Sequence, residues 1–193
     1  MVASKTAREG IDFLPLSVDV AEKAYAAGKL PGGFFKREGR PGTEAVLNAR
    51  LIDRPLRPLF PKNFHNDIQI VVSILSTDQE NTHESLGIVG ASCALAISDI
   101  PWDGPVASVR VGRINNELIV NPTNTLMEES DMSIIISGTK DSIVMVEGEA
   151  DFISEDDFLT VLQKHLHIVN HLTMLAEQGY YPPKKLLKND CPL

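Results

Sequence analysis

The sequence lacks the features that mark disulfide-rich, secreted or membrane-spanning proteins. Only two cysteines, Cys93 and Cys191, occur in 193 residues, and they are too far apart to suggest a disulfide framework. No apolar run approaches the roughly 20 residues that span a bilayer, and no secretory leader is recognisable. We therefore expect a cytoplasmic protein in which Cys93, within the apolar run ASCALAI, is a buried free thiol.

An overall excess of positive charge is also absent, because the formal net charge is −8. The basic residues gather in one stretch, residues 29–62, where eight Lys/Arg and three acids give a local charge of +5 and leave −13 for the rest. Such a distribution argues against indiscriminate nucleic-acid binding and favours anion contact along one surface. An apolar content of 43% is sufficient for a folded core without disulfide staples.

Hydrophobic periodicity predicts an α+β fold. Strands are predicted at residues 14–20, 68–75, 106–111, 118–120, 132–137 and 143–147. Helices are predicted at residues 43–53, 85–98 and 158–177. The first helix is expected to have Thr43 as its N-cap and to end or kink at Pro55, because proline has no amide donor. Strands that follow one another, with helices packed on one side, favour α+β over alternating βαβ units.

The segment FFKREGRPG, residues 34–42, is the most informative part of the chain. A turn at Pro31-Gly32-Gly33 precedes it and Pro41-Gly42 closes it, so we expect a loop. Its two phenylalanines and three cations could form a stacking platform for nucleic-acid bases beside phosphate-binding charges. The alternative is that both phenylalanines are core residues packed beneath the loop.

Three arginines follow this loop. Arg50 and Arg54 are one helical turn apart and share a face, and Arg57 comes after Pro55. A guanidinium fork suits phosphate oxygens. The alternative is local salt bridging, because Asp53 lies within reach of Arg50 or Arg57.

These motifs resemble a known family. FFKREGRP and RLIDRPLRPLFP are similar to the paired signatures of the polynucleotide phosphorylase family, in the first of its two ribonuclease PH-type domains. The similarity continues through DIQIVVSILSTD, IVGASCALAISDIPWDGPVASVRVG and VNPTNTLMEESDMSIIISGTKDSIVMVEGEA, from about residue 10 to about residue 155. The resemblance implies a ribonuclease PH-like mixed sheet with helices packed on it.

The resemblance also implies how the chain is divided. We expect a partial ribonuclease PH-type domain at residues 1–155, an amphipathic helix at 156–178 that closes it, and a tail at 179–193. The family's domain has several more strands before the position of Gly10, so we expect the chain to be truncated at both ends.

The family is expected to form a ring-shaped homotrimer that degrades single-stranded RNA 3′ to 5′, using inorganic phosphate and Mg²⁺ and releasing nucleoside diphosphates. In that family the FFKREGRP loop lines the constriction of the RNA channel, where arginine is frequent at the position of Lys36. The resemblance and the charge pattern together predict RNA contacts from Phe34, Phe35, Lys36, Arg37, Arg40, Arg50, Arg54 and Arg57.

At several positions this sequence lacks the residues that act in catalysis in the family's active domain. Thr82, His83 and Glu84 occupy the place of a Ser-rich phosphate loop, and Glu84 would repel phosphate. Asp131 matches one of two carboxylates, but Thr125 stands at the other. We therefore expect no catalytic residue and no bound metal in this chain. Its expected role is to guide RNA and to pack within the ring. The alternatives are a truncated structural or interaction module and an autonomous phosphorolytic enzyme.

Three histidines, His165, His167 and His171, lie in the last predicted helix. No cysteine or glutamate completes a zinc signature with them, so we expect exposed side chains rather than metal ligands.

Overall fold

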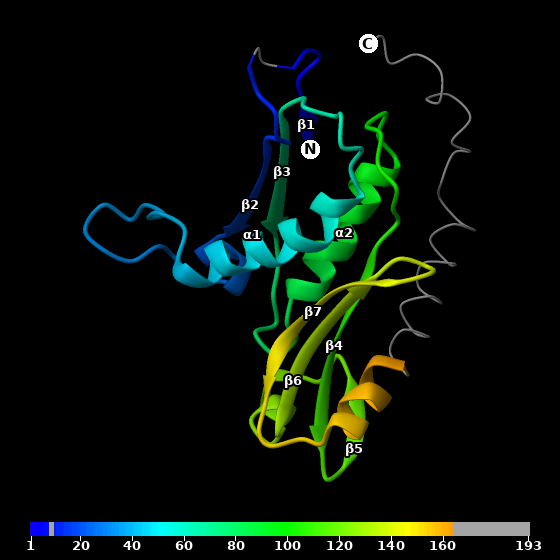
Figure 1. The fold of residues 1–193 in the computed structure, drawn as a ribbon. Helices are drawn as coiled ribbons and strands as arrows, with labels where there is room; N and C mark the ends of the chain where they lie inside the picture. Colours follow the sequence, from blue (N-terminus) through cyan, green and yellow to red (C-terminus); the bar gives the residue numbers. More distant parts are fainter. Residues whose placement is uncertain (8–9, 164–193) are drawn as a thin grey trace.

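The structure, a computed structural model, describes residues 1–7 and 10–163, which form two β-sheets with helices packed between them (Figure 1). The first sheet has the order β1-β3-β2, and the second has the order β5-β4-β6-β7. The first sheet contains β1 (Val2–Ala3), β2 (Leu16–Glu22) and β3 (Ile68–Ile74). The second sheet contains β4 (Ala107–Ile114), β5 (Glu117–Val120), β6 (Met132–Gly138) and β7 (Ile143–Ala150). The second sheet is antiparallel throughout, whereas β2 and β3 are parallel.

Two long helices, α1 (Thr43–Leu56) and α2 (Glu84–Ala96), join the sheets into one core. Leu56 of α1 and Ile88 of α2 are fully buried and cluster with β3 on one side and with Ile135 and Met145 of the second sheet on the other. The remaining helical segments are short: the 3₁₀ turns η1 (Ala24–Ala27) and η2 (Arg57–Leu59), α3 (Asn124–Met127) and residues 155–163.

The opposite face of the second sheet has its own core. Val111 of β4 and Ile136 of β6 are fully buried there, together with Val161 from the helical residues 155–163. The second sheet is therefore covered on both faces. Its strands are accordingly rich in Val and Ile on both sides instead of alternating strictly with polar residues.

The predicted α+β fold is confirmed, with local corrections. The N-cap of α1 is Gly42 and not Thr43, and no side chain caps this end. The helix also passes through Pro55 and ends at Leu56, whose carbonyl accepts a hydrogen bond from Trp102 Nε1 at 3.2 Å. Burial of Leu56 and this bond to its carbonyl favour the extra turn over the stop that proline alone would cause.

Two further expectations concern Cys93 and the last predicted helix. Cys93 is exposed on α2, so the prediction of a buried thiol is wrong. The apolar run that contains it faces the core with only some of its residues, including Ala91 and Leu95. The last predicted helix begins at residue 155, and its remainder, with all three histidines, lies outside the described residues.

Candidate nucleic-acid interface

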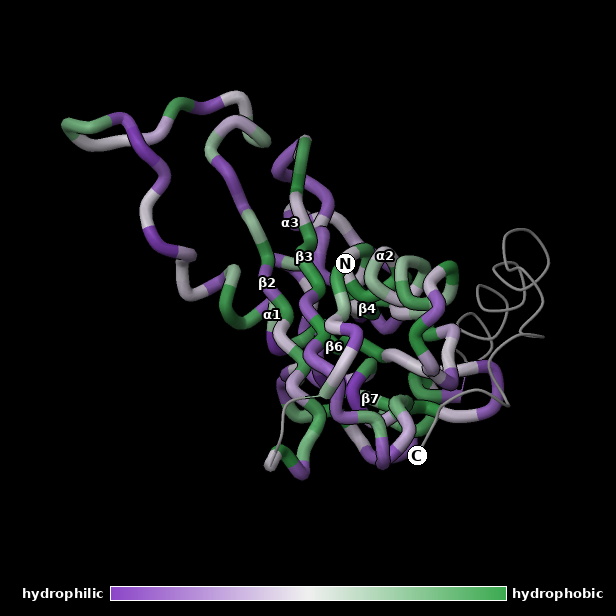
Figure 2. Tube along the Cα trace, turned by 90° about the horizontal axis from the view of Figure 1, so that it is seen from above, coloured by the Kyte–Doolittle hydropathy of each residue, from purple (hydrophilic) through white to green (hydrophobic). Residues whose placement is uncertain are grey.

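The loop between η1 and α1 projects away from both sheets (Figure 1), and a second view shows the same projection from above (Figure 2). All residues from 32 to 40 are exposed. Two of them have left-handed backbone angles, Gly33 with φ of 78° and Lys36 with φ of 50°. Glycine adopts this region readily, so Gly33 suits the turn that starts the projection.

The two phenylalanines lie on the outside of this loop. Phe34 is 93% exposed and Phe35 is 76% exposed. Their ring centroids are 5.3 Å apart in an edge-to-face arrangement. The alternative that these rings are core residues is therefore wrong, and both present aromatic surface to solvent. A pair of exposed rings on a protruding loop can stack on unpaired bases.

Polar contacts hold the base of the loop. Glu38 Oε1 accepts a hydrogen bond from the backbone N–H of Ala24 at 2.9 Å, which supplies a partner at the N-terminal end of η1, where Lys23 provides no side-chain cap. Lys29 Nζ donates to Gln79 Oε1 at 3.3 Å. Glu38 has a role that we did not predict; the signal in the sequence was a lone acid among the cations of the loop.

Four of the predicted cations point to solvent without an acidic partner in the part of the chain that the structure describes. They are Lys36, Arg37 and Arg40 in the loop and Arg50 on α1. An unpaired guanidinium on the surface keeps its donors available for phosphate oxygens. The loop and the adjoining face of α1 therefore combine aromatic surface with free positive charge.

Arg54 and Arg57 are placed differently. Arg54 forms an ion pair with Glu147 of β7, which ties α1 to the second sheet. Arg57 binds both carboxylate oxygens of Asp53, at 3.0 and 2.8 Å, and donates to the carbonyls of Leu14 and Leu16 at 3.0 and 3.1 Å. Four of the five N–H groups of a guanidinium are thus used inside the protein. The local salt bridging left open by the sequence describes Arg57.

The positions that match the family's catalytic groups are also engaged in internal contacts. Glu84 accepts from Arg110 at 3.4 Å. Asp131 receives three hydrogen bonds from Arg113, the shortest at 2.6 Å, and these lower the pKa of Asp131 and raise that of Arg113. Asp157 is a second partner of Arg113, at 3.1 Å. Because an arginine engages both carboxylate oxygens of Asp131, this side chain does not fit the role of a Mg²⁺ ligand.

Thr125 takes part in a separate contact. Its backbone N–H donates to Glu80 Oε1 at 3.3 Å, and hydrogen bonds from the side chains of Thr125 and then Thr123 hold the pKa of Glu80 below its ordinary value. This contact links α3 to the turn after β3 and uses Thr125, at the position of the family's second carboxylate, as a hydrogen-bond donor to Glu80.

Across residues 1–7 and 10–163, no group of three or more His, Cys, Asp or Glu side chains is arranged to hold a metal ion. Over the same residues, no helix has the length and apolarity needed to cross a membrane.

Comparison with known proteins places the chain in a family. The model described as "3′ exoribonuclease family, domain 1" matches residues 1–101, and the one described as "3′ exoribonuclease family, domain 2" matches residues 104–164. The chain belongs to the 3′ exoribonuclease family. The first match covers the three-stranded sheet with α1 and α2, and the second covers the four-stranded sheet.

Among curated relatives, the polyribonucleotide nucleotidyltransferase of Thermomicrobium roseum is 54% identical over 169 residues, which are 87% of this chain and 21% of that protein. The corresponding protein of Heliobacterium modesticaldum is 53% identical over 159 residues, 82% of this chain and 22% of that protein. The chain thus spans about a fifth of the length of these relatives. The resemblance to polynucleotide phosphorylase seen in the motifs is confirmed.

A solved structure supports the fold. The crystal structure of rice (Oryza sativa) Rrp46 superposes with a TM-score of 0.67, covering 91% of this chain and 78% of that chain at 13% identity. At this identity the likeness shows the ribonuclease PH-like fold alone.

Proposed function

We propose that this chain is the RNA-guiding part of a polynucleotide phosphorylase, an enzyme that degrades single-stranded RNA 3′ to 5′ by phosphorolysis and releases nucleoside diphosphates. The chain guides RNA and packs against other parts of the assembly, a homotrimer or a second core domain, in the cytoplasm. Catalysis belongs to parts of the enzyme other than this chain.

The observation that carries the proposal is the projecting loop with two exposed phenyl rings beside unpaired cations. Stacking of one base on an aromatic side chain contributes about 1–3 kcal/mol and does not depend on base identity. Lys36, Arg37 and Arg40 follow the rings directly in the chain and expose their charges. A strand of RNA can therefore stack a base on Phe34 or Phe35 while its phosphates meet these cations.

The internal contacts of the catalytic positions support a guiding role. Inorganic phosphate would meet the carboxylate of Glu84, which Arg110 holds near the start of α2. Mg²⁺ would have to displace Arg113 from Asp131. Neither Glu84 nor Asp131 therefore fits its group, and we place both the Mg²⁺ and the phosphate of the full enzyme outside the described part of this chain.

A titration of single-stranded RNA against salt tests the proposal. Arg37→Ala, Arg40→Ala and Arg50→Ala should each weaken binding for every sequence and flatten the slope of log K against log salt by about 0.7 per lost phosphate contact. Phe34→Ala should weaken binding and leave the slope nearly unchanged, because stacking releases few counterions. Lys5→Ala, an exposed cation near the other end of β2, is the matched control and should change neither.

The alternative function is a structural or interaction module without RNA contacts. Unchanged RNA affinity at low salt in the three arginine variants would favour it and contradict the guiding role.

A further inference from the structure

An acidic side chain lies in the middle of the basic loop. Glu38 directly follows Lys36 and Arg37 and precedes Arg40, so its charge opposes that of the proposed RNA-binding surface. Within the described residues it forms no ion pair with any of these cations. A carboxylate beside phosphate contacts weakens RNA binding by repulsion unless another contact of that side chain offsets the effect.

Glu38 reaches back to the body of the protein. Its Oε1 accepts a hydrogen bond from the backbone N–H of Ala24 at 2.9 Å, between residues 14 apart in the chain. The bond is charge-assisted, and it satisfies a donor at the first residue of η1 that the side chain of Lys23 does not cap. It therefore ties the returning half of the loop to the segment from which the loop departs.

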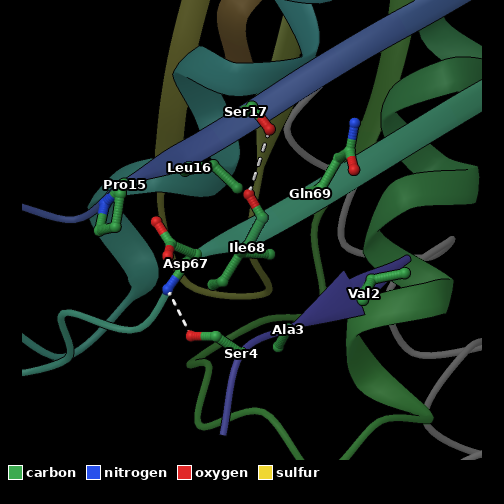
Figure 3. A pocket seen from close by; sticks show the side chains of 9 residues that line it. All are labelled: Val2, Ala3, Ser4, Pro15, Leu16, Ser17, Asp67, Ile68 and Gln69. Atoms are coloured by element: carbon green, nitrogen blue, oxygen red, sulfur yellow. Dashed lines mark hydrogen bonds between the residues drawn. The ribbon is translucent and has the colours of Figure 1, made fainter. Parts of the chain in front are cut away.

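The segment that receives this contact is itself held in place. Ala26 of η1 is buried, and its carbonyl accepts a hydrogen bond from the N–H of Thr77 at 3.0 Å, just beyond the end of β3. Before η1 comes β2, which pairs with β3 over seven residues. Figure 3 shows the opposite end of this pair, where the Ser17 hydroxyl donates to the carbonyl of Ile68 at 3.4 Å. The donor for Glu38 thus belongs to a well-anchored part of the fold.

The contact lies close in sequence to the two phenyl rings. Residues 33–36 form a turn, with Phe34 and Phe35 at its centre. Its ends have left-handed backbone angles, with φ of 78° at Gly33 and 50° at Lys36. A non-glycine residue in this region is strained and persists where surrounding contacts hold it. Because Glu38 is only two residues beyond Lys36, its bond to the body of the protein restricts the conformations of the turn.

We propose that Glu38 raises the affinity of the loop for single-stranded RNA, although its charge has the same sign as that of RNA. By accepting from the N–H of Ala24, the carboxylate holds the turn with both phenyl rings set for stacking before RNA arrives. A pre-organised loop loses less conformational entropy on binding. Glu38 is thus a positioning residue that does not itself contact RNA, and the inference rests on the proposed RNA-guiding function.

Two substitutions separate the hydrogen bond of Glu38 from its charge. Glu38→Gln and Glu38→Ala both remove the negative charge, but only glutamine keeps an oxygen that can accept from Ala24. In titrations of the full chain with single-stranded poly(A), Glu38→Gln should bind at least as tightly as the parent, because repulsion is removed. Glu38→Ala should bind about fivefold more weakly than Glu38→Gln, since its loop is only fractionally in the binding-competent form. The two variants should have equal salt dependence, because their charges are equal.

Glu44 provides the matched pair of control variants. It is an exposed acid in the first turn of α1, in the same basic stretch, and its carboxylate has no hydrogen-bond partner among the described residues. Glu44→Ala and Glu44→Gln should therefore bind RNA equally.

Amide hydrogen exchange measures the contact without RNA. The N–H of Ala24 should exchange about fivefold faster in Glu38→Ala than in Glu38→Gln, because only the glutamine can protect it. Thermal melts of all four variants should coincide with that of the parent, because the loop lies outside both hydrophobic cores.

Three results would overturn the inference. Equal RNA affinity of Glu38→Ala and Glu38→Gln, with Phe34→Ala and Arg37→Ala still weakened, would do so and leave the RNA-guiding function standing. If Phe34→Ala and Arg37→Ala also bound RNA as the parent does, the guiding function would be overturned and the inference with it. A lower melting temperature in Glu38→Ala alone would assign this side chain a general role in folding instead of a positioning role.

Discussion

Arg57→Ala should destabilise the fold without weakening RNA binding. The guanidinium joins the end of α1 to the start of β2 through Asp53, Leu14 O and Leu16 O. Hydrogen bonds to charged groups contribute about 1.5–3 kcal/mol each, but the two side chains are 41% and 27% exposed, so solvent screening reduces the sum. We expect a total loss of about 2 kcal/mol, which for a domain of this size lowers the melting temperature by about 4–8 °C.

Circular dichroism melts and RNA titrations on the same samples measure both effects. Arg57→Lys should also lower the melting temperature, because an ammonium group cannot reproduce the fork. Arg37→Ala is the control, as its side chain is exposed in the loop; it should leave the melt unchanged and weaken RNA binding. An Arg57→Ala protein with the parent's melting temperature and a flatter salt dependence of RNA binding would refute this reasoning.

Three further outcomes are expected. The chain alone should release no nucleoside diphosphate from single-stranded RNA with phosphate and Mg²⁺; turnover that disappears in Asp131→Asn would contradict the guiding role. Since Arg113 holds the folded-state pKa of Asp131 below its ordinary value, this pair should stabilise the fold above the unfolded-state pKa of about 3.9, and that contribution should disappear as pH falls through the folded-state pKa. Acid titrations of unfolding should therefore show a smaller pH dependence in Asp131→Asn than in the parent. Gly148→Ala should cost about 2–4 kcal/mol in denaturant unfolding, because its Cβ would lie 2.1 Å from the carbonyl oxygen of Ser133, whereas Gly90→Ala on α2 meets nothing within 4 Å and should be neutral or stabilising.

Local patterns predicted most of the fold. The Val/Ile-rich run at residues 68–75 is the strand Ile68–Ile74, because β-branched residues in a short apolar run favour extended backbone. The two-sheet arrangement was not predicted. Nor was the parallel pairing of β2 with β3 predicted; the two strands are 45 or more residues apart in the chain, and α1 follows β2 in sequence and packs on it. A hydrophobic pattern shows that a strand exists, but it does not show which strand lies beside it.

The candidate site was predicted in part, for a similar reason. Composition indicated a loop with rings and cations, since glycine and proline flank it, but exposure of Phe34 and Phe35 depends on the loop pointing away from both sheets. The internal role of Arg57 depends on the carbonyl of Leu14, which is 43 residues distant in sequence. Only the nearby partner, Asp53, could be foreseen from helical spacing.

The projecting loop also marks a place where the polypeptide can be interrupted. Residues 32–40 are exposed and include Lys36 and Arg37, which are residues after which trypsin cleaves, whereas Pro41 prevents cleavage after Arg40. A cut there would separate β1 and β2 from the rest of the chain. The two fragments would still share the seven-residue pairing of β2 with β3 and the packing of β2 on α1. The protein is therefore suited to fragment complementation, in which a short N-terminal peptide and the larger remainder reassemble without a covalent link.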